Sequence, residues 1–475
     1  MKQRNIPLLE QLIKQTEKEQ FSFHVPGHKN GALLIENGKR FFSPLLKMDS
    51  TELTDLDDLH APEGVIKEAE QLAAELYRSK KTFFLVGGST VGNLAMVLAS
   101  CKDGDTVFVQ RNCHKSVMNA CRLAKVHPVF LTAQTDETTG FATGICQETL
   151  EAALRAFPQA KALVLTYPNY YGMTYPLKPV IDLAHEKGLA VLVDEAHGAH
   201  FTLGAPFPPS ALDLGADVVV HSAHKTLPAM TMASFLHVHK ESIVKEEDIR
   251  MYLTMLQSSS PSYPLMASLD VARSYVASLD KNRVQKIVES HENFRKQLQK
   301  IRQWKVIAAS DPLKITLQSR CEATGFELQE RLEEKGIFVE LANEHHLLLV
   351  LPLAPLEEVM DVCELLNRMK EAVGELPMKK EPLKLLELSL PPYTELELTY
   401  KEMETKQKVR VPLKEALGSI AAETIIPYPP GIPFIMEGEP LTEEKVEALL
   451  AMKKSGVRFQ SEKDVFVSGI KIFER

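Results

Sequence analysis

The chain is organised around one stretch, Val218-Val219-Val220-His221-Ser222-Ala223-His224-Lys225-Thr226. The run of β-branched residues predicts a buried strand. The small and polar residues after it predict that the strand ends there and delivers Lys225 into a cavity. A lysine in such a place is either a capped surface charge or an amine that forms an imine. The stretch alone leaves both interpretations open.

Around this stretch, short apolar runs alternate with stretches of helical periodicity. The predicted strands are Thr82–Val86, Thr106–Val109, Pro128–Leu131, Ala162–Thr166, Ala190–Val193, Val218–Val220 and Ala233–Val238. The predicted helices between them are Asn93–Ser100, Ser116–Ala124, Gln147–Ala156 and Leu177–Lys187. This alternation predicts an α/β fold with a mostly parallel, seven-stranded sheet and a site at the carboxyl ends of its strands.

The flanking regions have their own patterns. Helices are predicted at Leu8–Gln20 and from Gly64 to Tyr77, and long helices at Leu265–Leu279 and Val284–Ile301, the second a solvated rod joining two lobes. A smaller α+β lobe is predicted from a helix at Gly325–Lys335 and from strands at Lys305–Ala309, Lys314–Leu317, Gly336–Glu340 and His346–Leu351.

Composition narrows the class of protein. Of 475 residues, 44% are hydrophobic and 25% are charged, and the formal net charge is −8, which argues against binding nucleic acid by neutralising phosphates. No apolar run is long enough for a transmembrane helix, and the first residues lack the apolar core of a secretory signal. Six cysteines without zinc spacing predict reduced thiols, so we expect a cytoplasmic protein that does not act at a membrane.

The first candidate functional motif is Gly87-Gly88-Ser89-Thr90-Val91-Gly92-Asn93, which follows a predicted strand and opens a helix. Its glycines let the backbone approach a ligand, and Ser89 and Thr90 add hydroxyl donors, which suits a phosphate. It is neither a Walker A loop nor a dinucleotide-binding motif. A simple helix cap is the alternative.

The second candidate is Asp194, at the end of a predicted buried strand. A buried carboxylate needs a cationic partner, and a protonated pyridine nitrogen would be one. Capping of the next turn is the alternative. A metal site of Asp194, His197 and His200 ranks below both because no further ligand is evident, and we predict no metal.

The third candidate is His114, which follows the strand that ends near Val109. Its imidazole could cover a planar cofactor, or it could make a local hydrogen bond at a helix start. Ser222 and His224 flank Lys225 and could donate to a phosphate. The order of glycine loop, histidine, aspartate and lysine predicts that pyridoxal 5′-phosphate (PLP) binds as a Schiff base on Lys225.

Taken together, these motifs resemble the Orn/Lys/Arg decarboxylase family, PLP enzymes of the aspartate aminotransferase fold (fold type I). The resemblance rests on His24-Val25-Pro26-Gly27-His28-Lys29, Asp55-Leu56-Asp57-Asp58-Leu59, Gly88-Ser89-Thr90-Val91-Gly92-Asn93, Arg111-Asn112-Cys113-His114-Lys115-Ser116, Asp194-Glu195-Ala196-His197, Ser222-Ala223-His224-Lys225, Ser260-Pro261-Ser262-Tyr263-Pro264-Leu265-Met266-Ala267-Ser268-Leu269-Asp270 and Pro427-Tyr428-Pro429-Pro430-Gly431-Ile432-Pro433. It implies an N-terminal segment (1–60), a large PLP-binding domain (61–270), a small α+β domain (271–376) and a C-terminal decarboxylase domain (377–475). The chain starts almost directly at its first helix, so it resembles the short branch without an N-terminal wing domain.

The resemblance also implies roles for single residues. Lys225 forms the imine, Asp194 pairs with the pyridine nitrogen, and His197 lies against the ring on the Asp194 side. His114 stacks on the ring. The phosphate is surrounded by Ser89, Thr90, Ser222 and His224, beside the backbone of Gly88. The residues implied to be catalytic are Lys225, His224, Asp194 and His114.

The implied reaction is decarboxylation of a basic L-amino acid to the amine and CO2, in polyamine-type metabolism, with arginine the first choice, lysine the second and ornithine the third. Glu437, with Asp55 or Asp57, is the candidate for holding the distal cation, and solvated surface acids are the alternative. Segment 258–263 resembles one that reaches a neighbouring subunit, so we expect a homodimer with shared active sites. The rival functions are an aminotransferase or aldolase of the same fold, and a catalytically silent regulatory homologue.

Overall fold

The computed structural model describes residues 2–18, 21–379, 391–428, 433–454, 456–460 and 463–474. Its contacts divide the chain into two compact units, each built from two stretches of sequence. The first unit comprises Met1–Ser100 and Ala190–Val284, and the second comprises Cys101–Leu189 and Gln285–Arg475.

The first unit contains strands in the order β1-β7-β6-β5. Their bounds are β1 (Lys81–Leu85), β5 (Ala190–Asp194), β6 (Val218–His221) and β7 (Ser234–Val238). Strands β5 and β6 are parallel, with Asp194 beside Val220, whereas β7 is antiparallel to both β6 and β1. Almost every residue of these strands is buried, as expected for a sheet that is covered on both faces.

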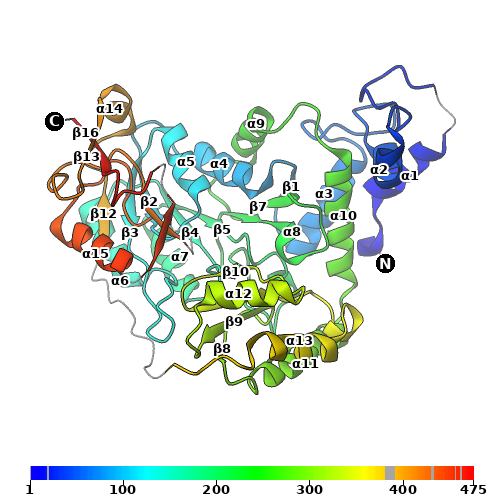
Figure 1. The fold of residues 1–475 in the computed structure, drawn as a ribbon. Helices are drawn as coiled ribbons and strands as arrows, with labels where there is room; N and C mark the ends of the chain where they lie inside the picture. Colours follow the sequence, from blue (N-terminus) through cyan, green and yellow to red (C-terminus); the bar gives the residue numbers. More distant parts are fainter. Residues whose placement is uncertain are drawn as a thin grey trace. The chain divides into compact units, whose positions relative to one another are not determined.

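Helices complete the first unit (Figure 1). They are α1 (Pro7–Glu17), α2 (Glu36–Met48), α3 (Val65–Tyr77), α4 (Gly88–Ser100), α8 (Ala223–Thr226), α9 (Glu246–Leu256) and α10 (Tyr263–Ser278), with the short turns η1 (Lys2–Arg4) and η2 (Phe201–Leu203). Helix α4 contacts β1, β5, β6 and β7 through an apolar face that includes Val91, Ala95 and Met96. Helix α4 begins close to the carboxyl end of β1, since only Val86 and Gly87 separate the two elements.

The second unit contains strands in the order β4-β2-β3-β12. Strands β2 (Thr106–Gln110), β3 (His127–Leu131) and β4 (Ala162–Thr166) are parallel, and β12 (Tyr393–Glu395) is antiparallel to β3. The connecting helices are α5 (Lys115–Ala124), α6 (Gln147–Ala156) and α7 (Leu177–Glu186). All seven predicted strands of the large sheet are thus present in the described residues, and β12 is an additional strand that the sequence analysis did not predict.

A smaller α+β part of the second unit is confirmed (Figure 1). Its antiparallel strands, in the order β10-β11-β9-β8, are β8 (Trp304–Ile307), β9 (Lys314–Ser319), β10 (Leu341–Ala342) and β11 (His346–Val350). The helices are α11 (Lys281–Leu298), α12 (Gly325–Glu334) and α13 (Val362–Val373), and the turn η3 spans Leu356–Glu358. A capping box between Thr324 and Glu327 explains why α12 begins where it does.

Two predictions in this part are wrong. Gly336–Glu340 is a turn and irregular chain rather than a strand, because Ile337 and Val339 pack their side chains on the core without joining the sheet. Helix α11 is not a wholly solvated rod, since Phe294 and Leu298 belong to the same buried core. Charged residues such as Lys281, Lys286, Glu289 and Lys296 are exposed.

The C-terminal part of the second unit has its own core. Its elements are α14 (Tyr400–Thr405), β13 (Lys408–Val411), β14 (Ile426–Tyr428), α15 (Glu443–Lys454), β15 (Arg458–Gln460) and β16 (Ile470–Phe473). Strand β13 pairs with β16, and β14 pairs with β15. Pro429–Ile432 of the predicted tail motif lie outside the described residues.

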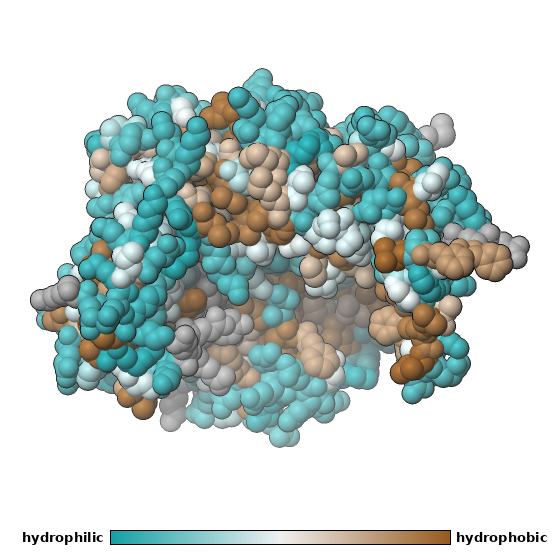
Figure 2. Space-filling model, turned by 90° about the horizontal axis from the view of Figure 1, so that it is seen from above, coloured by the Kyte–Doolittle hydropathy of each residue, from teal (hydrophilic) through white to brown (hydrophobic). Residues whose placement is uncertain are grey.

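The face seen in Figure 2 is mainly hydrophilic, with patches of exposed apolar side chains. Many of these belong to the N-terminal segment, where Phe21 is 92% exposed, Phe23 95%, Ile35 79% and Phe41 71%. None of the helices in the described ranges combines the length and apolar composition needed to cross a bilayer.

Candidate active site

Lys225 follows β6 as the sequence predicts. The four residues of β6 are fully buried, Ser222 precedes the single turn of α8, and Lys225 lies in that turn. The Lys225 Nζ atom lies 3.1 Å from Nε2 of His197, which comes from the loop after β5. Since β5 and β6 are parallel, the residues that follow them meet at one edge of the strands.

Asp194 is the last residue of β5 and is only 4% exposed. Its Oδ2 accepts a hydrogen bond of 2.8 Å from Nδ2 of Asn93 in α4, and its Oδ1 accepts one of 3.2 Å from the backbone N–H of Ala196. These two hydrogen bonds hold the buried Asp194 side chain in place at the end of β5.

The glycine loop forms the start of α4. Gly88 has a φ of +74°, which favours glycine, and a Cβ atom at Gly92 would lie 2.8 Å from Leu85 and 2.9 Å from Val220. Ser89 Oγ lies 2.7 Å from Ser222 Oγ and donates to Ser234 Oγ at 3.2 Å, whereas Thr90 is exposed. Three hydroxyl groups thus gather at the N-terminus of a 13-residue helix.

His224 is half-buried beside Lys225. Its Nδ1 lies 3.1 Å from the backbone oxygen of Ala233, and because a carbonyl oxygen only accepts, this nitrogen carries a proton. In the neutral ring the other nitrogen, Nε2, is then the basic one. His224 Nε2 is therefore a proton acceptor in a defined position.

Glu195, the next residue after Asp194, starts a buried polar chain. Its side chain accepts hydrogen bonds from Ser210 Oγ at 2.6 Å, from the Ala211 N–H at 2.8 Å and from His221 Nε2 at 2.6 Å. His221 Nδ1 lies 3.1 Å from His237 Nε2. Burial, together with the neighbouring His221, lowers the pKa of His237 well below its ordinary value, so His237 is neutral. This polar chain fixes Glu195, the residue after Asp194, and His221, the residue before Ser222.

His114 and Glu437 belong to the second unit. His114 is exposed and caps α5, with its Nδ1 2.8 Å from Ser116 Oγ and accepting from the Ser116 N–H. Glu437 makes ion pairs with Arg122 of α5 and, at 2.7 Å, with Lys408 of β13. A substrate cation would have to compete with both of these partners.

The two acidic residues of the N-terminal loop differ from each other. Asp55 is exposed and pairs with Lys18 at 3.0 Å. Asp57 is buried, and its carboxylate accepts hydrogen bonds from the backbone N–H groups of Asp58, Glu63, Gly64, Ile66 and Lys67. Asp57 therefore caps the start of α3, so the alternative of a solvated surface acid fits Asp55 but not Asp57.

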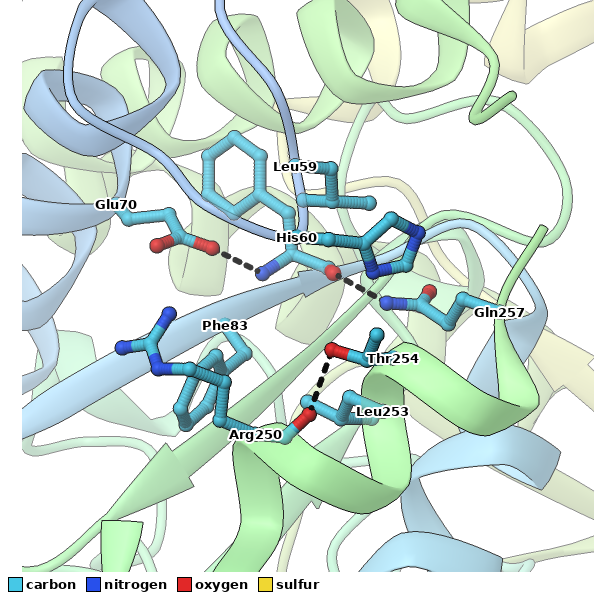
Figure 3. A pocket seen from close by; sticks show the side chains of 9 residues that line it. Leu59, His60, Glu70, Phe83, Arg250, Leu253, Thr254 and Gln257 are labelled. Atoms are coloured by element: carbon cyan, nitrogen blue, oxygen red, sulfur yellow. Dashed lines mark hydrogen bonds between the residues drawn. The ribbon is translucent and has the colours of Figure 1, made fainter. Parts of the chain in front are cut away.

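A small pocket of the first unit lies apart from these residues, at the outer edge of β1 (Figure 3). The Gln257 side chain occupies backbone groups at this edge: it accepts from the Val86 N–H at 2.8 Å and donates to the Phe84 carbonyl oxygen at 3.4 Å. Glu70 accepts from the Phe84 N–H at 3.0 Å and pairs with Lys81 at 2.6 Å. These side chains terminate the edge of the sheet, and no predicted site residue lines this pocket.

The alternative metal site has no support in the geometry. Across the described ranges, no group of three or more His, Cys, Asp or Glu side chains is arranged to hold a metal ion. Asp194 is bonded to Asn93, and the ring of His200 packs against Phe201 and Phe207, at centroid distances of 4.8 Å and 4.9 Å.

The sequence matches two family models over most of its length. Residues 6–322 match the Orn/Lys/Arg decarboxylase major domain, and residues 386–459 match the Orn/Lys/Arg decarboxylase C-terminal domain. The chain belongs to the Orn/Lys/Arg decarboxylase family. The resemblance inferred from the motifs is thereby confirmed.

The chain is also similar to individual proteins over nearly its whole length. The protein YaaO of Bacillus subtilis (strain 168), which is described as uncharacterized, is 46% identical over 94% of this chain and 94% of its own length. The arginine decarboxylase of the same strain is 32% identical over 100% of this chain and 99% of its own length.

Solved structures confirm the predicted fold. The lysine decarboxylase LdcF of Francisella novicida matches with a TM-score of 0.81 and 20% identity, covering 99% of this chain and 81% of that chain. A structure of SPT with PLP matches with a TM-score of 0.51 and 16% identity, covering 64% of this chain and 75% of that chain. This Orn/Lys/Arg decarboxylase family member therefore has the mostly parallel α/β fold shared with PLP-dependent fold type I enzymes.

Some residues of the site were not assigned a role from the sequence. Asn93 lies in the glycine motif, four residues after Ser89. This spacing places both side chains on the same face of a helix, which was the available sign that Asn93 belongs to the site. Ser234 has no signal of its own, because its place opposite Leu85 depends on the antiparallel pairing of β7 with β1. The Glu195–His221 pair likewise requires the register of β5 and β6.

Proposed function

We propose that this protein is a PLP-dependent decarboxylase that converts a basic L-amino acid to the amine and CO2. The observation that carries the proposal is the juxtaposition, within one unit, of Lys225 at 3.1 Å from His197 with a buried Asp194 held by Asn93. Membership of the Orn/Lys/Arg decarboxylase family supports the reaction type.

The residues of the first unit fit PLP by their chemistry. The hydroxyl groups of Ser89, Ser222 and Ser234, at the positive end of α4, suit a phosphate, beside the left-handed turn at Gly88. The buried carboxylate of Asp194 suits a protonated pyridine nitrogen. Lys225 would hold the cofactor covalently, and His197 would lie beside the ring. Thr90 and His224 would complete the phosphate site, and His114 of the second unit would cover the ring.

When bound, PLP supplies an electron sink for the pair that remains at Cα as CO2 leaves. The carboxylate of Asp194 would stabilise the positive charge of a protonated pyridine nitrogen. His197 Nε2 orients the Lys225 amine by accepting one of its hydrogens. Lys225 Nζ, or His224 Nε2 once it has taken up a proton, would then return a proton to Cα, since both groups follow β6 at its carboxyl end.

We propose arginine as the substrate, followed by lysine and ornithine, with a place in polyamine-type metabolism. The support is the arginine decarboxylase of Bacillus subtilis, which is similar over the full length of this chain. The distal cation would be held by a carboxylate. Glu437, Asp55 and Asp57 remain predictions for this role. Glu437 would first have to release Arg122 or Lys408, and Asp57 would have to release backbone N–H groups at the start of α3.

We also propose that the protein is a cytoplasmic homodimer with active sites shared between subunits. The exposed phenylalanines at Phe21, Phe23 and Phe41 support association, since large exposed apolar patches usually mark an interface. Sedimentation should give a dimer, and a variant made monomeric by changing these residues to acids should also lose PLP. A monomeric wild-type protein that retains PLP would contradict the dimer.

The proposed function is tested by two measurements on the purified protein. The Lys225→Ala variant should lose the visible absorbance that a lysine–PLP bond gives, and the wild-type protein should release CO2 from arginine without a keto acid. A requirement for a keto acid would favour an aminotransferase, and cleavage of a Cα–Cβ bond would favour an aldolase. PLP binding without turnover of any basic amino acid would favour a silent homologue.

A further inference from the structure

A buried ion pair connects the loop of His114 to the C-terminal part of the chain. Arg111 follows β2 and stands three residues before His114. Its Nη1 lies 2.6 Å from Oε1 of Glu439, and its Nη2 lies 2.8 Å from Oε2. The side chains are 7% and 0% exposed. Such a bidentate pair fixes both distance and orientation.

Further contacts extend the pair. Arg111 donates to the Phe434 carbonyl at 2.6 Å and to Thr394 Oγ1 at 2.7 Å. Glu439 accepts from Lys445 Nζ at 3.0 Å and from Thr394 Oγ1 at 2.8 Å. Burial alone would raise the pKa of Glu439, but Arg111 and Lys445 hold it at about 2. The pair is therefore charged at neutral pH.

A second set of contacts holds the chain on the other side of His114. Helix α5 starts at Lys115, and its Arg122 forms an ion pair with Glu437 and lies over the Tyr400 ring, at 5.2 Å from the centroid. Residues between 393 and 439 thus bind the chain both before and after His114. The distance along the sequence between Arg111 and Glu439 is 328 residues.

The nature of the contact indicates what it does. A buried ion pair adds little net stability compared with apolar packing, but losing one partner is costly and the geometry is strict. Apolar contacts would be enough to attach the C-terminal part, which already has a core of its own. A strict, charged contact beside an exposed loop is suited to fixing the loop's geometry.

We propose that Arg111 and Glu439 are positioning residues for His114, so that the C-terminal part of the chain sets the geometry of the His114 loop. The inference rests on the proposed function, in which His114 covers the PLP ring. Glu439 does not touch the cofactor in this account and acts only through Arg111 and the loop.

The test compares holoenzyme variants by the visible circular dichroism of bound PLP, by the Kd for PLP and by kcat and KM. Glu439→Gln should change the dichroism and raise the Kd about tenfold, with a larger effect on kcat than on KM. Arg111→Lys should retain part of the wild-type spectrum, because it keeps the charge but loses the bidentate contact. Thr394→Val is the milder variant, and should shift the spectrum in the same direction.

The matched control is Glu423→Gln. It breaks another ion pair of the C-terminal part, Arg410–Glu423 at 3.1 Å, which does not involve the His114 loop. This variant should lower the Tm without changing the dichroism of PLP. Equal spectra for Glu423→Gln and Glu439→Gln, at matched fractions of folded protein, would overturn the proposal.

The double variant His114→Ala, Glu439→Gln isolates the pathway. If Glu439 acts through His114, adding Glu439→Gln to His114→Ala changes neither the spectrum nor the Kd further. Additive effects would overturn the inference and leave the proposed function intact. If His114→Ala alone leaves PLP unchanged, the role of His114 in the proposed function fails instead.

Discussion

Replacing Asn93 with alanine should weaken PLP binding by removing the donor that holds Asp194. The Asn93 Nδ2 atom lies 2.8 Å from Asp194 Oδ2, and both side chains are almost fully buried. A hydrogen bond to a charged group contributes about 1.5–3 kcal/mol. Since each 1.4 kcal/mol is a factor of about ten, the Kd for PLP should rise roughly ten- to a hundredfold.

The assay is a titration of the apoprotein with PLP, followed by the absorbance of the bound cofactor. Ser210→Ala is the matched control, because Ser210 donates a hydrogen bond of 2.6 Å to Glu195, the neighbouring buried carboxylate. We expect it to reduce the free energy of unfolding by a similar amount while the Kd for PLP stays within about twofold of wild type. An Asn93→Ala protein that binds PLP as tightly as wild type would refute the role of Asn93 in holding Asp194 for the cofactor.

Other predictions concern stability. The buried His346 lies between Gln318 Nε2 and Asn343 Oδ1, and its burial, first of all, lowers its pKa to about 3. Below pH 6.5 the unfolded chain therefore binds a proton at this histidine that the folded chain does not. The free energy of unfolding should fall by up to about 1.4 kcal/mol per pH unit down to pH 3. Urea midpoints between pH 7 and 4.5 measure this fall, and His346→Gln should make its slope shallower. Asp57→Ala should lower the free energy of unfolding by about 1–2 kcal/mol through loss of the α3 cap, whereas Asp55→Ala, which removes one exposed ion pair, should change it by less than about 0.5 kcal/mol. Equal urea midpoints for the two variants would contradict the capping role.

Seven strands of the large sheet could be predicted because they are buried on both faces, whereas β12, whose residues are partly exposed, was missed. Runs such as Val218–Val220 and Ala162–Thr166 are continuous apolar stretches whose pattern needs no tertiary information. The direction of β7 could not be predicted, since an antiparallel strand of this kind has the same composition as a parallel one. The strand predicted at Gly336–Glu340 was wrong because Ile337 and Val339 pack on the core without pairing in a sheet.

The candidate site was predictable where chemistry is local to a strand end. Asp194 and Lys225 each follow a buried strand directly, and the parallel pairing of β5 and β6 brings them to one edge. The residues that orient them were not predictable in this way. Asn93 and Ser234 depend on strand register and helix rotation, and the Arg111–Glu439 pair joins positions that no local pattern connects.

The most direct test of the central claim is a product assay on the PLP-loaded protein with L-arginine, L-lysine and L-ornithine side by side. The account predicts stoichiometric CO2 and amine from at least one of them, with arginine the best substrate, and no turnover by the Lys225→Ala variant. Absence of CO2 from all three, in a protein shown to carry PLP on Lys225, would contradict it.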